Sequence, residues 1–206
     1  MKFYITSDTH FGHGRIIEYA NRPFKNCDEM NSRLISNWNQ RVKSEDTIFI
    51  NGDFCFRTDR LMSEQLGGLG KEKANFWINQ LNGNKIFIRG NHDSNNSLKT
   101  IIDCIHITFG GHRLNLVHKP EHGNIDFEIN LVGHIHQHWK MALFGNSLFI
   151  NVGVDVWKYM PVSLDEIMSL YGKFKAGHLK IDRVYNSIDD YTTAIFKSKD
   201  KHDENT

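Results

Sequence analysis

The sequence contains few cysteines and no long apolar run. Three cysteines occur among 206 residues, widely separated and without a CxxC pair. An odd, unpaired count argues against both a disulfide framework and a zinc ribbon, and it favours free thiols in a reducing cytosol. No apolar stretch approaches the roughly 20 residues needed to span a bilayer, and the chain reaches Asp8 too early for a signal peptide. These absences predict a cytoplasmic protein that does not enter a membrane.

The sequence also lacks a strong net charge. Its formal net charge is +1 with neutral histidines, and its pI is about 7.8. Lysine, arginine, aspartate and glutamate are mixed along the chain, so no bulk field attracts nucleic acid or an anionic surface. A nucleic-acid substrate would require a local basic patch. The length suits one large domain, which we place at 1–176. Residues 177–206 form a polar C-terminal extension, and its last ~10 residues have so little to bury that they should fray.

Short strands and helices alternate in the first half of the chain, and hairpins dominate the second half. Strands are expected at 2–7, 46–52, 85–90, 128–133 and 147–153, and a β-hairpin at 103–109 and 112–118 around Gly110-Gly111. Helices are expected at 15–22, at 29–43 with Asp28 as N-cap, at 74–83 closed by Gly83, and at 164–171 with a Ser163–Glu166 capping box, whereas 57–72 is ambiguous. This order predicts an α/β fold of two packed sheets with helices outside.

Side chains that can bind a metal follow one strand after another. They are Asp8, His10, Asp53, Asn91, His92, Asp93, His118, His134 and His136. The set offers oxygen and imidazole ligands without a thiolate, which suits Mn²⁺, Fe or Zn²⁺. It is too large for one tetrahedral ion. Two ions about 3.5–4 Å apart would need a bridging carboxylate, and Asp53 is the natural candidate.

Glycines precede several of these ligand positions. Gly52, Gly90 and Gly133 each stand immediately before one of them. The missing side chain permits a sharp turn at a strand end and a close approach of the backbone. The stretch LVGHIHQHW (131–139) adds histidines at alternate positions, whose side chains would point the same way on an extended chain. A bend would then bring His134 and His136 onto two neighbouring ions.

The motif order D-x-H, G-D, G-N-H-D, H and G-H-x-H resembles that of the calcineurin-like metallophosphoesterase superfamily. The resemblance extends over about residues 3–155 and is strongest to small single-domain phosphoesterases of bacteria and phages. The stretches SDTHFGHGRII and NVGVDVWKYMPVSLDEI look like signatures of one such subgroup. The resemblance implies a four-layer α/β/β/α sandwich of two mixed sheets flanked by helices, with a binuclear metal centre at the strand ends. Manganese is the favoured metal; Fe, Zn²⁺ and Ni²⁺ are the other candidates.

The resemblance also implies a role for each matching residue. The first ion would be bound by Asp8, His10 and His136, the second by Asn91, His118 and His134, and Asp53 would bridge both. His92 would contact the scissile phosphate or protonate the leaving group, and Asp93 would orient His92. A hydroxide between the two ions would attack phosphorus in line with the leaving oxygen. His13 and Arg15 are candidates for substrate binding. The superfamily motif ends at His136, so His138 is expected to contribute little.

Three functional hypotheses follow from these residues. The first is a metal-dependent phosphoesterase for a small phosphodiester or phosphomonoester, with a nucleotide as the favoured substrate. The second is a nuclease acting on DNA or RNA, against which the lack of a basic stripe counts. The third is a non-catalytic, metal-stabilised binding module, although such a scaffold would not need His92 and Asp93. The oligomeric state is left open.

Overall fold

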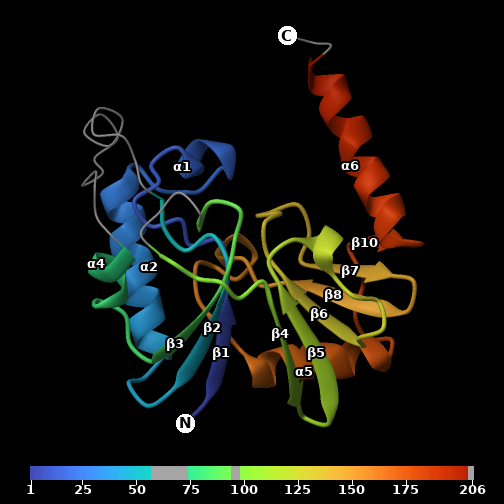
Figure 1. The fold of residues 1–206 in the computed structure, drawn as a ribbon, viewed down its shortest axis with the longest axis horizontal. Coiled ribbons are helices and arrows are strands. Elements are labelled where there is room, and N and C mark those ends of the chain that lie inside the picture. The colour runs from blue at the N-terminus through green and yellow to red at the C-terminus, as the bar shows by residue number, and fades with distance from the viewer. Residues whose placement is uncertain (57–73, 94–97, 204–206) are drawn as a thin grey trace.

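The computed structural model describes residues 1–56, 74–93 and 98–203, with side chains described up to Ile195. Two mixed sheets face one another, with helices outside them (Figure 1). This confirms the predicted α/β architecture. Among the described residues, no helix combines the length and the apolar character that crossing a membrane would demand.

The first sheet has the strand order β3-β2-β1-β9. Its members are β1 (Phe3–Thr6), β2 (Thr47–Asn51), β3 (Asn84–Ile88) and the short β9 (Val162–Ser163). Strands β1, β2 and β3 are parallel, with Thr6 opposite Ile50 and Asn51 opposite Ile88. Their carboxyl ends therefore lie at one edge of the sheet, and the loops that follow them meet there.

The second sheet has the strand order β10-β7-β8-β6-β5-β4. Its members are β4 (Cys104–Phe109), β5 (His112–Val117), β6 (Ile129–Val132), β7 (Met141–Phe144), β8 (Ser147–Asn151) and β10 (Arg183–Tyr185). The predicted β4–β5 hairpin is present, and positive φ values at Gly110 and Gly111 suit its two-residue turn. Strands β5, β6 and β8 are parallel, so their carboxyl ends also share an edge.

Helices pack against the outer faces of the two sheets and against the core between them. Helices α1 (Ile16–Tyr19), α2 (Cys27–Arg41) and α4 (Ala74–Ile78) lie outside the first sheet (Figure 1). Trp38 and Trp77 are buried on this side of the sheet. Helix α5 (Leu164–Lys175) packs Ile167 into the core between the sheets, and its predicted Ser163–Glu166 capping box is present. Helix α6 (Ile188–Asp203) packs Tyr191 against the outer face of the second sheet.

Several boundaries differ from the sequence predictions. Asn26, not Asp28, is the N-cap of α2, because the Asn26 side chain accepts a hydrogen bond from the Glu29 amide. Helix α4 ends at Ile78, well before Gly83. Strands β7, β9 and β10 and helix α6 were not expected. Helix α6 extends into the polar tail, whose fraying stays a prediction, and the ambiguous 57–72 segment lies outside the described residues.

Candidate metal centre

The candidate ligands meet where the carboxyl ends of the two sheets face each other. Backbone contacts join the sheets at this edge, because the Ser7 amide donates to the Val152 carbonyl at 3.1 Å. The buried Asn51 amide group reinforces the junction by donating to the carbonyls of Val117 and Leu131, at 2.8 and 3.0 Å. Side chains that follow strands of different sheets are thereby brought together.

Asp8, His10 and His136 form the first ligand group. One potential ligand atom from each lies within 4.8 Å of the others. The Asp8 carboxylate is fully buried and accepts hydrogen bonds from the His134 amide, at 3.1 Å on Oδ1 and 2.9 Å on Oδ2. These bonds fix the carboxylate from the side of the second sheet.

Asp53, His118 and His134 form the second ligand group, by the same 4.8 Å measure. His118 Nε2 lies 3.0 Å from Asn91 Oδ1 and 3.4 Å from Asp53 Oδ2. The other ring nitrogen, Nδ1, lies 2.8 Å from the Asn51 carbonyl oxygen, which can only accept. Nδ1 therefore carries a proton, and Nε2 is the ring nitrogen that faces the centre, toward Asn91 and Asp53.

Asp53 lies between the two groups. Its Oδ2 atom is 3.7 Å from His10 Nε2 on one side and 3.4 Å from His118 Nε2 on the other. The His92 amide donates to Oδ1 at 2.9 Å and holds the carboxylate in place. Asp53 thus lies close to a histidine of each group.

Many of these residues adopt a strained backbone conformation. Asp8, His10, Asp53, His134 and His136 have φ values of 56°, 51°, 51°, 72° and 46°. Residues other than glycine rarely adopt this left-handed region, and such strain concentrates at functional sites. The GHIH segment is consequently not extended, which corrects the expectation for LVGHIHQHW: β6 ends at Val132, and the two histidines lie in turns after it.

The three glycines before ligand positions permit the close approach that the sequence predicted. A Cβ on Gly90 would lie 2.2 Å from Asp53 Oδ1, and one on Gly52 would lie 2.3 Å from His118 Nδ1. A Cβ on Gly133 would lie 2.0 Å from Ser7 Oγ and 2.6 Å from Asp8 Oδ2. Each glycine leaves room for a ligand or for a residue that supports one.

The polar atoms of the first group suit a cation. His10 Nε2 is buried and has no hydrogen-bond partner within the described part of the chain. Burial holds the pKa of His10 well below its usual value, so its imidazole is neutral. Burial also raises the pKa of Asp8, although the neighbouring His118 and His136 oppose the rise. A cation would satisfy the unpartnered nitrogen and stabilise the buried carboxylate.

The second group is arranged around the Asp53 charge. Burial alone would raise the pKa of Asp53, but hydrogen bonding and charge from His118 outweigh it and lower the value. Burial lowers the pKa of His118, yet the carboxylates of Asp53 and Asp8 raise it overall to about 9. Burial and the His118 charge lower the pKa of His134 to about 4. A cation bound in this group would replace the proton on His118 as the positive charge that stabilises the Asp53 carboxylate.

His92 and Asp93 have different surroundings. The His92 side chain is half-exposed, and its Nε2 lies 4.0 Å from Asp53 Oδ2. The Asp93 carboxylate is buried and accepts from the backbone amides of Gly90 and Asp53, at 2.7 and 3.1 Å. Asp93 therefore shapes the loop that presents Asp53. Its expected role in orienting His92 stays a prediction.

Of the two candidate substrate-binding residues, His13 lies at the centre. Its Nδ1 is 3.2 Å from His10 Nδ1, and its ring stacks on Phe56 with centroids 4.1 Å apart. Burial, together with the nearby His92, lowers the pKa of His13 to about 4. The exposed ring of Tyr19 lies 6.4 Å from that of His13. Arg15 is exposed at the start of α1.

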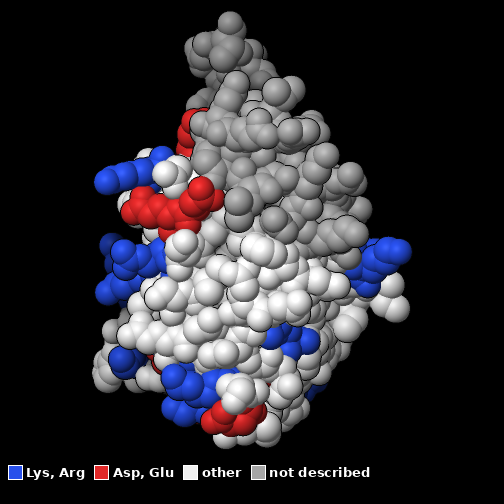
Figure 2. All heavy atoms as spheres, turned by 90° about the vertical axis from the view of Figure 1, so that its left-hand side faces the viewer, with Lys and Arg blue, Asp and Glu red and all other residues white. Residues whose placement is uncertain are grey.

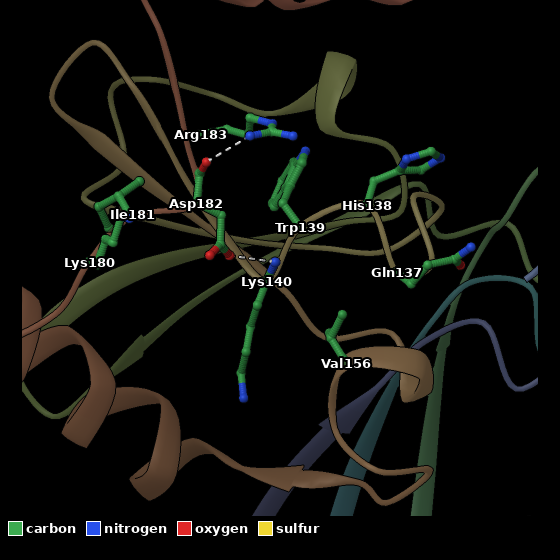
Figure 3. Close-up of a pocket in the computed structure, with 9 residues that line it drawn as sticks. All are labelled: Gln137, His138, Trp139, Lys140, Val156, Lys180, Ile181, Asp182 and Arg183. Atoms are coloured by element: carbon green, nitrogen blue, oxygen red, sulfur yellow. Dashed lines mark hydrogen bonds between the residues drawn. The ribbon is translucent and has the colours of Figure 1, made fainter. Parts of the chain in front are cut away.

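His138 belongs to a different hollow from His134 and His136. It is exposed and lines an open pocket of about 590 Å³ next to Trp139 (Figure 3). Lys140 and Arg183 also line this pocket, but Figure 3 shows their side chains pointing away from each other. The alternation of three histidines in the sequence thus does not extend to a shared site.

Sequence reasoning missed the residues that support the ligands from behind. Asp155 accepts a hydrogen bond from His136 and is paired with the buried Arg22. Asn151 donates to the carbonyls of His136 and Trp139, at 2.7 and 2.9 Å. The available signal was the stretch NVGVDVW, where Asp155 follows a strand end just as Asp8 and Asp53 do.

A family model for calcineurin-like phosphoesterases matches residues 1–203, and the chain therefore belongs to that family. An uncharacterized protein of Methanocaldococcus jannaschii is 37% identical over 179 residues, a match covering 84% of this chain and 93% of that protein. The gene 66 protein of Mycobacterium phage L5 is 27% identical over 202 residues, covering 81% and 92% respectively.

The fold is also found in solved structures. The crystal structure of a protein of unknown function from Aquifex aeolicus is 23% identical, with a TM-score of 0.59. The alignment covers 82% of this chain and 98% of that one. Family membership makes phosphoester hydrolysis the class of activity to test, and the two ligand groups supply candidate positions for a metal.

Proposed function

We propose that the protein is a binuclear metal-dependent phosphoesterase that hydrolyses a small phosphodiester or phosphomonoester, with a nucleotide-like substrate favoured. The observation that carries this proposal is the convergence of two ligand groups on Asp53. Asp8, His10 and His136 would hold one cation, His118, His134 and Asn91 the other, and Asp53 both. Mn²⁺ is the favoured ion, with Fe, Zn²⁺ and Ni²⁺ as alternatives.

The bound cations would supply an activated water and would neutralise charge on the phosphate. The chain itself supplies the proton donor. His92 is half-exposed beside Asp53, so its ring can reach a leaving-group oxygen on the open side of the centre. The His92 backbone amide donates a hydrogen bond to Asp53 Oδ1. This bond fixes the position of the His92 backbone, from which the ring extends. General acid catalysis of this kind contributes about 10²–10⁴-fold to a rate.

The surroundings of the centre support a small substrate with an aromatic part. His13, Phe56 and the exposed Tyr19 form a group of rings on the His92 side. A nucleobase or another flat ring could stack on the exposed face of Tyr19. The charge distribution argues against a polynucleotide: on the face in Figure 2, described lysine and arginine side chains are scattered and interspersed with acidic ones. The net charge of +1 points the same way.

The proposal is tested with purified full-length protein, Mn²⁺, and a panel of aryl phosphodiesters, aryl phosphomonoesters and cyclic nucleotides. We expect turnover of at least one member, lost in Asp53→Asn and retained in Asp126→Asn, which changes an exposed carboxylate outside the centre. Cleavage of single-stranded or duplex nucleic acid in a gel assay, with no turnover of the small esters, would favour a nuclease instead. Tight cation binding without any hydrolysis would favour a binding module.

A further inference from the structure

Two buried charged side chains lie directly behind the first ligand group. Arg22 and Asp155 form an ion pair, with Nε–Oδ1 and Nη2–Oδ2 distances of 2.8 and 3.1 Å. Their side chains are only 0% and 2% exposed. Burying two charges carries a large desolvation cost, so such a pair persists only with excellent geometry and further hydrogen bonds.

Asp155 sets the tautomer of His136, one of the candidate ligands. Its Oδ2 atom lies 2.9 Å from His136 Nδ1, and a carboxylate paired with a guanidinium offers only acceptor atoms. The proton of a neutral His136 must therefore sit on Nδ1, which leaves Nε2 as the nitrogen with a free lone pair. A carboxylate behind a ligating histidine fixes both the tautomer and the ring orientation.

Arg22 holds another ligand of the same group through its backbone. Its Nη2 donates to the Asp8 carbonyl at 2.7 Å, and its Nη1 donates to the Thr9 carbonyl at 3.1 Å. A contact from Nη1 to Met30 Sδ at 3.4 Å completes the set, so every N–H of the guanidinium has a partner. The Asp8 backbone is in the left-handed region, and these bonds stabilise it there.

The fold places Asp155 independently of any cation. It lies in the short 3₁₀ helix η3 (Val154–Val156), whose first amide donates to the Ser7 carbonyl at 3.1 Å. Ser7 also forms a β-bridge with Gly153. Residues just after β1 and just after β8 are thereby tied together, and Arg22 joins them from the loop before α2.

We infer that Arg22 and Asp155 are a positioning pair for the first cation. Asp155 presents His136 Nε2, and Arg22 fixes the Asp8 backbone while neutralising Asp155. One guanidinium thereby supports Asp8 directly and His136 through Asp155, two residues that follow strands of different sheets. This inference rests on the proposed function, because it assumes that Asp8, His10 and His136 bind a cation.

Calorimetric titration of Mn²⁺ into the metal-free, full-length protein tests the inference without relying on turnover. We expect two binding events in the wild-type protein. His136→Ala and His134→Ala identify which event belongs to which ligand group. Asp155→Asn should weaken the His136 event by about 10–100-fold, the usual effect of losing such a support, and leave the other unchanged. Asp126→Asn is the matched control and should change neither event.

Folding is checked for each variant by circular dichroism. If Asp155→Asn does not fold, Arg22→Lys replaces it, with Arg41→Lys as control, since Arg41 pairs with Glu166 away from the ligands. Lysine cannot hold the carboxylate and both carbonyls at once, so the same selective loss is expected. Two unchanged binding events in a folded variant would overturn the inference alone. A wild-type protein that binds no cation would overturn both the inference and the proposed function.

Discussion

Adding one methyl group at Gly133 should damage the first ligand group from a position that touches no cation. The new Cβ would lie 2.0 Å from Ser7 Oγ, 2.7 Å from Ser7 Cβ and 2.6 Å from Asp8 Oδ2. These distances are far below van der Waals contact, and Ser7 and Asp8 are both fully buried. The Ser7 hydroxyl also donates to the Asn51 carbonyl at 2.7 Å, so it cannot move without breaking that bond.

The magnitude follows from these contacts. Overpacking a tight site costs about 1–3 kcal/mol, and losing a buried hydrogen bond about 1 kcal/mol. We therefore expect Gly133→Ala to lower the free energy of unfolding of the metal-free protein by about 2–4 kcal/mol. Because Asp8 must also shift, affinity for the first cation should fall. Urea denaturation measures the stability, and calorimetric Mn²⁺ titration measures the affinity.

Gly172→Ala is the matched control. Gly172 lies within α5, and a Cβ there would meet nothing within 4 Å. Alanine is the better helix former by about 0.5–1 kcal/mol, so this variant should be slightly more stable and should bind cations normally. A Gly133→Ala protein with wild-type stability and wild-type cation affinity would refute the packing argument.

Further predictions concern catalysis, pH and helix capping. His92→Ala should lower kcat by about 10²–10⁴-fold in steady-state assays; an unchanged kcat would rule out proton donation. The pKa of His118 is raised to about 9, so its stabilising contribution to the metal-free protein is full below its unfolded pKa of about 6.5. That contribution should be lost as the pH rises through about 9, and His118→Asn should flatten the decline in urea denaturation. Ser163→Ala should cost about 1 kcal/mol of stability, with cation binding unaltered; a loss of cation binding would contradict the assignment of Ser163 to capping.

The clustering of the candidate ligands could be predicted because each lies within a few residues of a strand end. In parallel sheets the carboxyl ends of strands share an edge. The proximity of residues such as Asp8 and Asp53 can therefore be inferred from the sequence. Among the supporting residues, Asp155 follows a strand end in NVGVDVW, but nothing in the sequence links it to Arg22. Arg22 lies between a short helix and Pro23, and its partner Asp155 is more than 130 residues away. Only the tertiary fold brings that pair together.

The missed elements have local causes. Strand β7 spans four largely buried residues, so it lacks the alternation of apolar and polar side chains that reveals a half-exposed strand. Strand β9 has two residues. At the start of α2, Asn26 and Asp28 both suit an N-cap, and the structure shows that Asn26 accepts the Glu29 amide. The turn geometry of His134 and His136 depends on left-handed backbone that their alternate spacing concealed.

The most direct test of a two-cation phosphoesterase is the rate of aryl phosphoester hydrolysis as Mn²⁺ is titrated into the metal-free protein. The two ligand groups around Asp53 predict that the rate rises with added Mn²⁺ and reaches its plateau at two equivalents per chain. A protein that binds two equivalents of Mn²⁺ and hydrolyses neither monoesters nor diesters would contradict the account.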